Sequence, residues 1–170
     1  MKGWLAAILL LSTLALPAHA NAPKLAVFDL ELIDTSVDGD VPPPKAVQER
    51  ALRAGEQLRR ELAQSGVFGI VDIAPVSAAA HDSNLQACGG CDVKFARQLG
   101  ADLALTGVVR KISNLILNIS LFVRDVSSGR LVATMNADMR GDTDESWSRT
   151  TNYLVRNRLL APNYGAPQPQ

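Results

Sequence analysis

The clearest pattern in the chain is an alternation of apolar and polar residues between Leu115 and Arg140, interrupted at Ser127-Ser128-Gly129. The apolar residues occupy the odd positions: Leu115, Leu117, Ile119, Leu121, Val123, Leu131, Ala133, Met135, Ala137 and Met139. Side chains alternate between the two faces of a strand, so this pattern predicts a long antiparallel hairpin with one apolar face. Helices must cover that face, because nothing else in the chain can.

The even positions of the predicted hairpin combine hydrogen-bonding side chains with two large apolar ones. A candidate binding surface is formed by Ile116, Asn118, Ser120, Phe122, Thr134 and Asn136. Apolar anchors among amide and hydroxyl groups suit a protein interface. An ordinary surface, with a loop or helix over Phe122, explains the same residues equally well. The sequence leaves both interpretations open.

The rest of the chain alternates between strand and helix patterns. Strands are predicted at residues 24–33, 67–73 and 101–112, and helices at residues 45–64, 92–99 and 142–160. The last helix has a predicted buried stripe of Trp147, Thr151, Leu154, Val155 and Leu159. Together these elements predict one α/β domain over residues 21–160, with a mixed five-stranded sheet and helices packed mainly on one face. Residues 161–170 are expected to form a loose tail.

Residues 1–20 have the features of a signal peptide. Lys2 gives a positive start, an apolar run follows from Trp4 to Leu16, and Ala18-His19-Ala20 forms a small-x-small cleavage site. The run is too short for a membrane span, and no later segment approaches the ~20 apolar residues that a span needs. Cleavage after Ala20 and export to the periplasm are therefore expected.

The charge and the histidine content of the chain exclude several classes of function. The chain has 17 basic and 17 acidic residues, and loss of the leader removes only Lys2 from this balance. A chain that is close to neutral, without a basic run, is a poor partner for nucleic acid or an anionic membrane. His81 is the only histidine outside the leader, which argues against catalytic triads and histidine-ligated zinc. We predict no enzyme activity, no cofactor and no metal.

The sharpest local motif is Cys88-Gly89-Gly90-Cys91. Two cysteines in an exported chain most simply form a disulfide with each other. The alternative is a redox-active or metal-transferring pair, since a cysteine at a helix N-terminus can have a lowered pKa. Against a redox role, the motif follows an irregular loop and not the first strand of a thioredoxin-like unit. Zinc would need two further ligands, of which His81 is one at most, and haem attachment would need a histidine where Asp92 stands.

Three groups of acids need an interpretation. Asp29 and Glu31 are expected to share a face of one predicted strand, either near a strand end or paired with Arg110 or Arg124 across the sheet. A catalytic carboxylate pair is the less favoured interpretation. Asp142, Asp144 and Glu145 do not have the spacing of a calcium loop. Asp142 is expected to cap the last helix, and Glu145 is expected to complete a capping box and to pair with Arg149. The third group, Asp34, Asp38 and Asp40, is expected in a solvated loop.

Several stretches carry a resemblance to known families. At the level of fold, "SGVFGIVD" (residues 65–72), "LGADLALTG" (residues 99–107) and "DVSSGRLV" (residues 125–132) resemble the N-terminal domain of TolB, CsgG and the lipoprotein activators of penicillin-binding proteins. A more specific resemblance is to an uncharacterised family of exported proteobacterial proteins. It rests on "AVFDLELIDTS" (residues 26–36), "NLQACGGCD" (residues 84–92), "ISNLILNI" (residues 112–119) and "DESWSR" (residues 144–149).

These resemblances imply a function. Genes of the uncharacterised family tend to lie near those for pyrroloquinoline-quinone (PQQ)-dependent alcohol oxidation, and the fold relatives with known roles bind other envelope proteins. The expectation is a periplasmic, non-enzymatic accessory protein that contacts an envelope protein or complex, by analogy of fold. The alternative is a thiol-disulfide or metal-handling accessory that uses Cys88 and Cys91.

Overall fold

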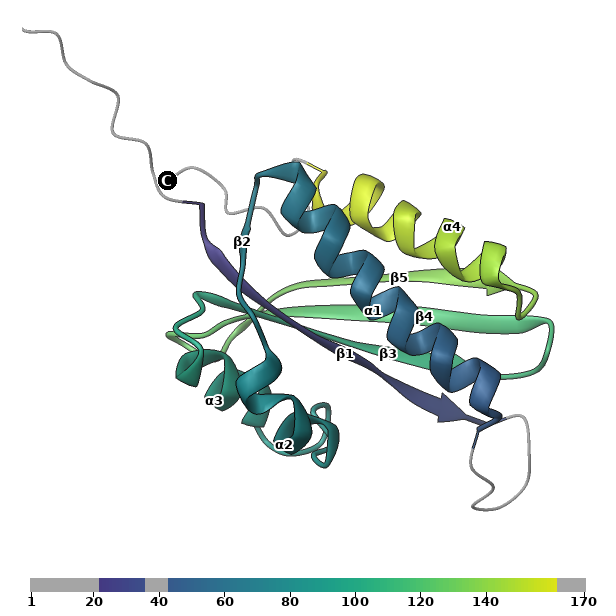
Figure 1. The fold of residues 1–170 in the computed structure, drawn as a ribbon, viewed down its shortest axis with the longest axis horizontal. Coiled ribbons are helices and arrows are strands. Elements are labelled where there is room, and N and C mark those ends of the chain that lie inside the picture. The colour runs from purple at the N-terminus through teal and green to yellow at the C-terminus, as the bar shows by residue number, and fades with distance from the viewer. Residues whose placement is uncertain (1–21, 36–42, 162–170) are drawn as a thin grey trace, which may run out of the picture.

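The computed structural model describes residues 22–35 and 43–161. Its elements are β1 (Lys24–Asp34), α1 (Lys45–Ser65), β2 (Gly69–Ile70), the 3-10 turn η1 (Ala74–Val76), α2 (Ser77–His81), α3 (Cys91–Gln98), β3 (Leu103–Lys111), β4 (Ile116–Asp125), β5 (Leu131–Arg140), α4 (Asp144–Leu154) and the π-helical turn η2 (Val155–Leu159). They form a single α/β domain with one five-stranded sheet in the order β2-β1-β3-β4-β5 (Figure 1). The predicted fold class is confirmed.

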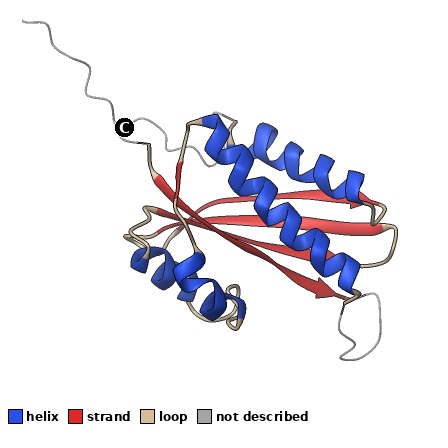
Figure 2. Ribbon diagram, viewed as in Figure 1, coloured by secondary structure: helices blue, strands red, loops and turns tan. Residues whose placement is uncertain are grey.

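The sheet is mixed. Strand β1 pairs in parallel with β2 and β3, whereas β3–β4 and β4–β5 are antiparallel. The two long helices, α1 and α4, lie across the same face of the sheet (Figure 2). They cover the apolar side of the β4–β5 hairpin, where Leu117, Leu121 and Met139 are almost fully buried. The expectation that helices cover this face is therefore confirmed.

The opposite face is covered at one corner only. The short helices α2 and α3 pack beside β1 and β3 (Figure 1), where Phe28, Ala104 and Val126 belong to a second, smaller core. No helix of the described chain lies over the β4–β5 part of this face (Figure 2). Coverage is therefore complete on one side of the sheet and partial on the other.

An irregularity in β1 determines how its side chains are distributed. Val27 is opposite Leu105 and Leu30 is opposite Gly107, so β1 has one residue more than β3 between these two points. The extra residue is a β-bulge. It places Leu30 against Gly107, where a Cβ would lie 2.4 Å from Leu30 Cδ2 and 2.7 Å from Leu121 Cδ2. The bulge therefore requires a residue without a side chain at position 107.

The hairpin departs from its ideal pattern at its ends. Leu115 precedes β4 and is 72% exposed, and Leu131 is 46% exposed. The register between β4 and β5 shifts after Val123, so that Arg124 is opposite Leu131 and Val132 is the extra residue. The prediction that these two leucines face the core is wrong, because strict alternation does not survive a register shift or the end of a strand.

Helix α4 confirms the predicted buried stripe but not the predicted cap. All five stripe residues are buried. The cap is Thr143, whose Oγ1 accepts a hydrogen bond from the N–H of Ser146. Asp142 instead accepts from Trp147 Nε1 at 2.8 Å. A capping residue must lie one position before the helix, and the helix begins one residue later than the acidic cluster suggested.

Replacing Gly107 with alanine should destabilise the protein by about 1–3 kcal/mol, because the added methyl group overpacks a filled contact between Leu30 and Leu121. Gly69→Ala is the matched control, since its Cβ would meet nothing closer than 3.8 Å in β2. The measurement is urea unfolding of both variants. Equal midpoints for the two variants would show that the contact at Gly107 is not tight.

Candidate binding surfaces

The predicted binding surface is a single patch on the uncovered sheet face. Its six residues have the opposite parity to the buried residues of β4 and β5, and so point away from α1 and α4. Cross-strand neighbours bring them together: Ser120 is opposite Asn136 and Phe122 is opposite Thr134. Ile116 is 51% exposed, and Thr134 and Asn136 are exposed. We call this patch (Ile116, Asn118, Ser120, Phe122, Thr134 and Asn136) the sheet-face patch.

The sheet-face patch carries a short hydrogen-bonded row. Asn118 Nδ2 donates to Asp138 Oδ1 at 2.9 Å, and Ser120 Oγ donates to Asn118 Oδ1 at 2.8 Å. These bonds hold the half-buried Asn118 and Ser120 in place. The exposed Thr134 and Asn136 on the neighbouring strand lie beside this row. The patch therefore presents ordered polar groups, with Ile116 and Phe122 as its apolar members.

Cys88 and Cys91 are bonded to each other, with their Cα atoms 5.7 Å apart. The glycines between them have positive φ angles of 70° and 105°, which residues with a side chain rarely adopt. Cys88 is exposed and Cys91 is half-buried. Cys88 Sγ accepts the N–H of Cys91 at 3.3 Å, at the first turn of α3. The disulfide thus closes the loop that leads into this helix.

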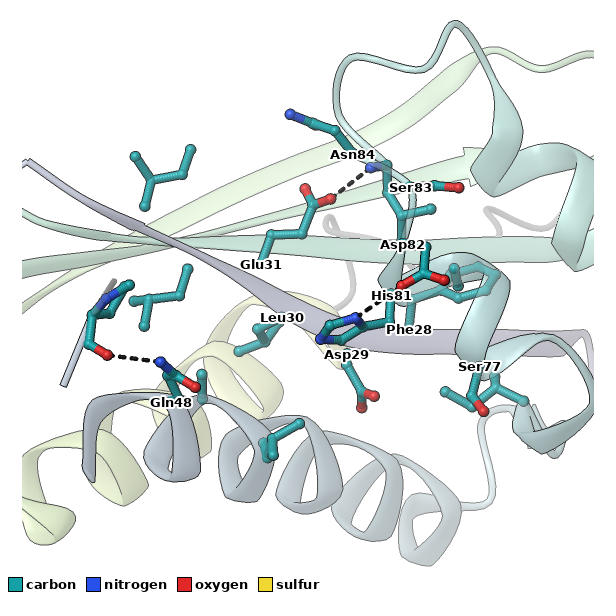
Figure 3. A pocket seen from close by; sticks show the side chains of 18 residues that line it. Phe28, Asp29, Leu30, Glu31, Gln48, Ser77, His81, Asp82, Ser83 and Asn84 are labelled. Carbon is teal, nitrogen blue, oxygen red and sulfur yellow. Dashed lines mark hydrogen bonds and ion pairs between the residues drawn. The ribbon is translucent and has the colours of Figure 1, made fainter. Parts of the chain in front are cut away.

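The bulge in β1 separates Asp29 from Glu31. Asp29 accepts a hydrogen bond from Arg59 of α1 at 2.8 Å, on the face covered by the long helices. Glu31 points the other way and accepts from the N–H of Leu85 at 2.5 Å (Figure 3). The prediction that the two carboxylates share a face is wrong, and their partners are Arg59 and the N–H of Leu85 instead of Arg110 or Arg124. The extra residue of β1 lies between Val27 and Leu30, and the shifted alternation leaves the two carboxylates on opposite faces, which removes the geometry of a catalytic pair.

A groove of about 470 Å³ runs along the free edge of β1, between α1 and the segment that contains α2 (Figure 3). We call it the edge groove; its lining includes Glu31, Leu32, Ile33, Leu52, His81 and Leu85. Ile33 is 40% exposed and Leu52 is 48% exposed, so its walls carry accessible apolar surface. Its volume lies within the ~300–1,000 Å³ that is common for ligand pockets.

Glu31 is a half-buried charge in the edge groove. Burial raises the pKa of its carboxyl group, and the backbone N–H groups of Leu85 and Gln86 offset part of that effect. The isolated His81 lies at the rim, where its Nδ1 is 3.6 Å from Asp82 and both side chains are largely exposed. The groove therefore places one desolvated carboxylate among apolar side chains.

The remaining acids are structural. Asp142 and Asp144 bind Arg50 of α1 at 3.3 Å and 2.7 Å and so connect the two long helices. Glu145 pairs with Arg149, as predicted. Asp34 was expected in a solvated loop, but it ends β1 with a side chain only 3% exposed and lies 3.5 Å from Lys111. Asp38 and Asp40 lie outside the described residues.

Within residues 22–35 and 43–161, no group of three or more histidine, cysteine, aspartate or glutamate side chains is placed to hold a metal ion. In the same part of the chain, no helix has the length and apolar character needed to cross a bilayer. The predicted leader and all but the first residue of the predicted tail lie outside the described residues.

Comparison with known families identifies the chain at the level of family. The family model DUF3280, described as "Protein of unknown function (DUF2380)", matches residues 23–159. The chain belongs to this family. The match includes the cysteine motif, the hairpin and α4, which agrees with the nearly full-length resemblance expected from the sequence. No curated protein matches the chain in sequence.

Solved structures with a similar fold come from three proteins. The C-terminal domain of LpoB from Salmonella enterica has a TM-score of 0.52 at 18% identity, covering 73% of this chain and 87% of that one. PelC from Paraburkholderia phytofirmans, solved as a dodecamer, has a TM-score of 0.52 at 14% identity, covering 82% and 89%. Lipoprotein GNA1162 from Neisseria meningitidis has a TM-score of 0.52 at 15% identity, covering 79% and 92%. Identities this low show a shared fold alone.

The edge groove leaves almost no signal in the amino-acid sequence. Its one signal was Leu52, an apolar residue that is not on the buried stripe of α1 formed by Val47, Ala51 and Leu58. An apolar residue off the stripe is common on protein surfaces, so it does not by itself indicate a groove. The groove exists because β2 ends at Ile70, whereas the pattern of residues 67–73 predicted a longer strand.

The effect of Glu31 on stability gives a test of the groove's electrostatics. Its pKa is higher in the folded than in the unfolded protein, so the ionised carboxylate destabilises the fold at neutral pH, and this penalty disappears below the unfolded pKa of about 4.5. Glu31→Gln keeps an oxygen to accept from Leu85 and should raise the free energy of unfolding at pH 7. The gain should vanish below about pH 4.5.

The control for this measurement is Glu56→Gln, an exposed position on α1. Urea unfolding at a series of pH values compares both variants with the unchanged protein. A Glu31→Gln variant that is less stable than the parent at pH 7 would show that Glu31 is not destabilised by burial.

Proposed function

We propose that this protein is a periplasmic, non-enzymatic accessory that binds another envelope protein through the sheet-face patch. The observation that carries the proposal is the uncovered β4–β5 face, where ordered polar groups adjoin Ile116 and Phe122. A sheet face with this composition has the mixed chemistry of protein interfaces. The fold shared with LpoB and with lipoprotein GNA1162 is consistent with a place in the cell envelope.

The pathway proposed for this accessory is PQQ-dependent alcohol oxidation. The support is the gene neighbourhood associated with the family that the sequence resembles. A binding role in such a pathway needs neither a bound cofactor nor a catalytic group, because the chemistry would belong to the partner. The separation of Asp29 and Glu31 by the bulge supports a non-enzymatic role.

The sheet-face patch is tested by a Thr134→Arg, Asn136→Arg double variant. Both side chains are exposed, so the variant should keep its thermal midpoint within a few degrees while two bulky charges block contact. Crosslinking in native periplasm should capture an envelope protein with the unchanged bait and lose at least about 90% of it with the variant, a tenfold change equivalent to about 1.4 kcal/mol.

The matched control places the same charges elsewhere, as Ala63→Arg and Gln64→Arg at the exposed end of α1. Capture by this control should equal that of the unchanged protein. Equal capture by the sheet-face variant would place the interface on another surface, and mass spectrometry of the captured protein would test the proposed pathway.

A thiol-disulfide accessory is the second candidate, favoured by the position of Cys88. The residue is exposed and its sulfur accepts a backbone N–H at the start of α3, an arrangement that stabilises a thiolate once the disulfide is reduced. Such a protein would exchange its disulfide with a cysteine pair of a partner protein through a mixed disulfide.

Replacing both cysteines with serine separates the two candidates. A binding module should keep its partner capture and lose no more than about 2 kcal/mol of stability, because the disulfide closes a very small loop. A thiol-disulfide accessory should lose its function, and the single Cys91→Ser variant should trap a partner covalently on Cys88. The readouts are capture yield, urea unfolding and non-reducing electrophoresis.

A further inference from the structure

The edge of β1 is open along most of its length in the described chain. Strand β2 pairs with β1 only at Lys24 and Leu25. After Ile70 the chain leaves the sheet, because Asp72 accepts the N–H of Ala74 at 2.9 Å and Pro75 begins a 3-10 turn. Beyond that point, no described strand pairs with the side of β1 that faces away from β3.

Backbone groups on this open side are available in the middle of the edge groove. Thr35 donates its N–H to Lys111 of β3, and backbone groups alternate between the two sides of a strand. The N–H and C=O of Leu32 therefore point away from β3, into the groove. Nearer the bulge, Arg59 donates to the C=O of Val27 at 3.1 Å, which closes that end of the edge.

The walls of the edge groove are apolar on both sides. Leu52 projects from α1, and Ile33 projects from β1 toward the opposite side. The charged side chains that line the groove are Asp29, Glu31, His81 and Asp82, and none of the described lining residues is lysine or arginine. Arg59 already neutralises Asp29. The charge that remains inside is Glu31, which suits a cation.

We propose that the edge groove binds an extended peptide segment of a partner protein, which adds to β1 as a strand and places a lysine or arginine beside Glu31. Strand addition uses main-chain hydrogen bonds for affinity and alternate side chains for specificity. An exposed strand edge between two apolar walls provides both elements. This surface is separate from the sheet-face patch, so the two proposals can fail independently.

The probe is a phage-displayed library of random nine-residue peptides, selected on the mature full-length protein. The enriched peptides should have apolar residues at alternate positions and a lysine or arginine between them. Fluorescence anisotropy of an enriched peptide then gives its Kd. Selection of no peptides, or of peptides without a basic residue, would overturn the proposal.

Three variants locate the binding. Leu52→Lys should weaken peptide binding at least about tenfold, the effect of about 1.4 kcal/mol, while Leu131→Lys makes the same change at a site of similar exposure, 46% against 48%, and should have no effect. Glu31→Gln should weaken binding of basic peptides several-fold and leave a peptide with glutamine in place of the basic residue unchanged. Equal affinities for the two leucine variants would overturn the proposal.

Three further measurements test the backbone contact, the identity of the occupant and the separation of the groove from the sheet-face patch. Leu32→Pro removes the N–H on the open side and should abolish binding, with circular dichroism confirming that the sheet is kept, since proline is tolerated at strand edges. Sedimentation should show the same mass for the unchanged protein and for Leu52→Lys. A dimer that dissociates in Leu52→Lys would make a second copy the occupant and overturn the proposal. The Thr134→Arg, Asn136→Arg variant should bind the peptide normally.

Discussion

The contact of Leu30 with Gly107 is the constraint on which the central sheet depends. One extra residue in β1 must be accommodated between two parallel strands, and only a glycine on β3 leaves space for the displaced leucine. The bulge also decides what lies on each face after it. It turns Asp29 toward Arg59 and Glu31 toward the N–H of Leu85. Helix α1 packs closely against the bulge at Gly55, where an added Cβ would lie only 3.3 Å from the carboxylate of Asp29.

The early end of β2 is the second feature that shapes the structure, because it leaves the edge of β1 open. A longer β2 would have paired with the whole of β1 and filled the edge groove. Instead the chain turns away after two residues, and side chains replace the missing strand. Arg59 binds the C=O of Val27, and the loop at Leu85 holds Glu31. At the far end, Asp34 and Lys111 form an ion pair with side chains 3% and 5% exposed. The desolvation cost of a buried ion pair offsets much of its attraction, so the pair adds little net stability. Here it joins the end of β1 to the end of β3.

The sequence predicted elements well where a single period runs for ten residues or more. The hairpin, α1 and the buried stripe of α4 all have this property, and helices covering the apolar face followed from it. The predictions fail where a single residue shifts the alternation of a strand or the start of a helix. The bulge inverted the expected positions of Asp29 and Glu31, the register shift exposed Leu131, and a start one residue later gave the cap to Thr143 instead of Asp142. The six residues of the sheet-face patch share a face as predicted, whereas the edge groove needed the end of β2, which no periodicity defines.

The two uncovered regions have different chemistry, and this difference bears on function. In the sheet-face patch, Ser120 already bonds Asn118, and the backbone of β4 is paired on both sides, by β3 and by β5. A partner there must match side chains that are fixed in position, which favours a folded surface. The edge groove offers unpaired backbone and one desolvated carboxylate instead, which favours a segment without structure of its own. A protein with both could hold a folded partner and an extended segment at once. Both sites lie on one sheet. If one partner protein carried both the folded surface and the extended segment, binding at the first site would make binding at the second intramolecular, and two weak affinities would combine.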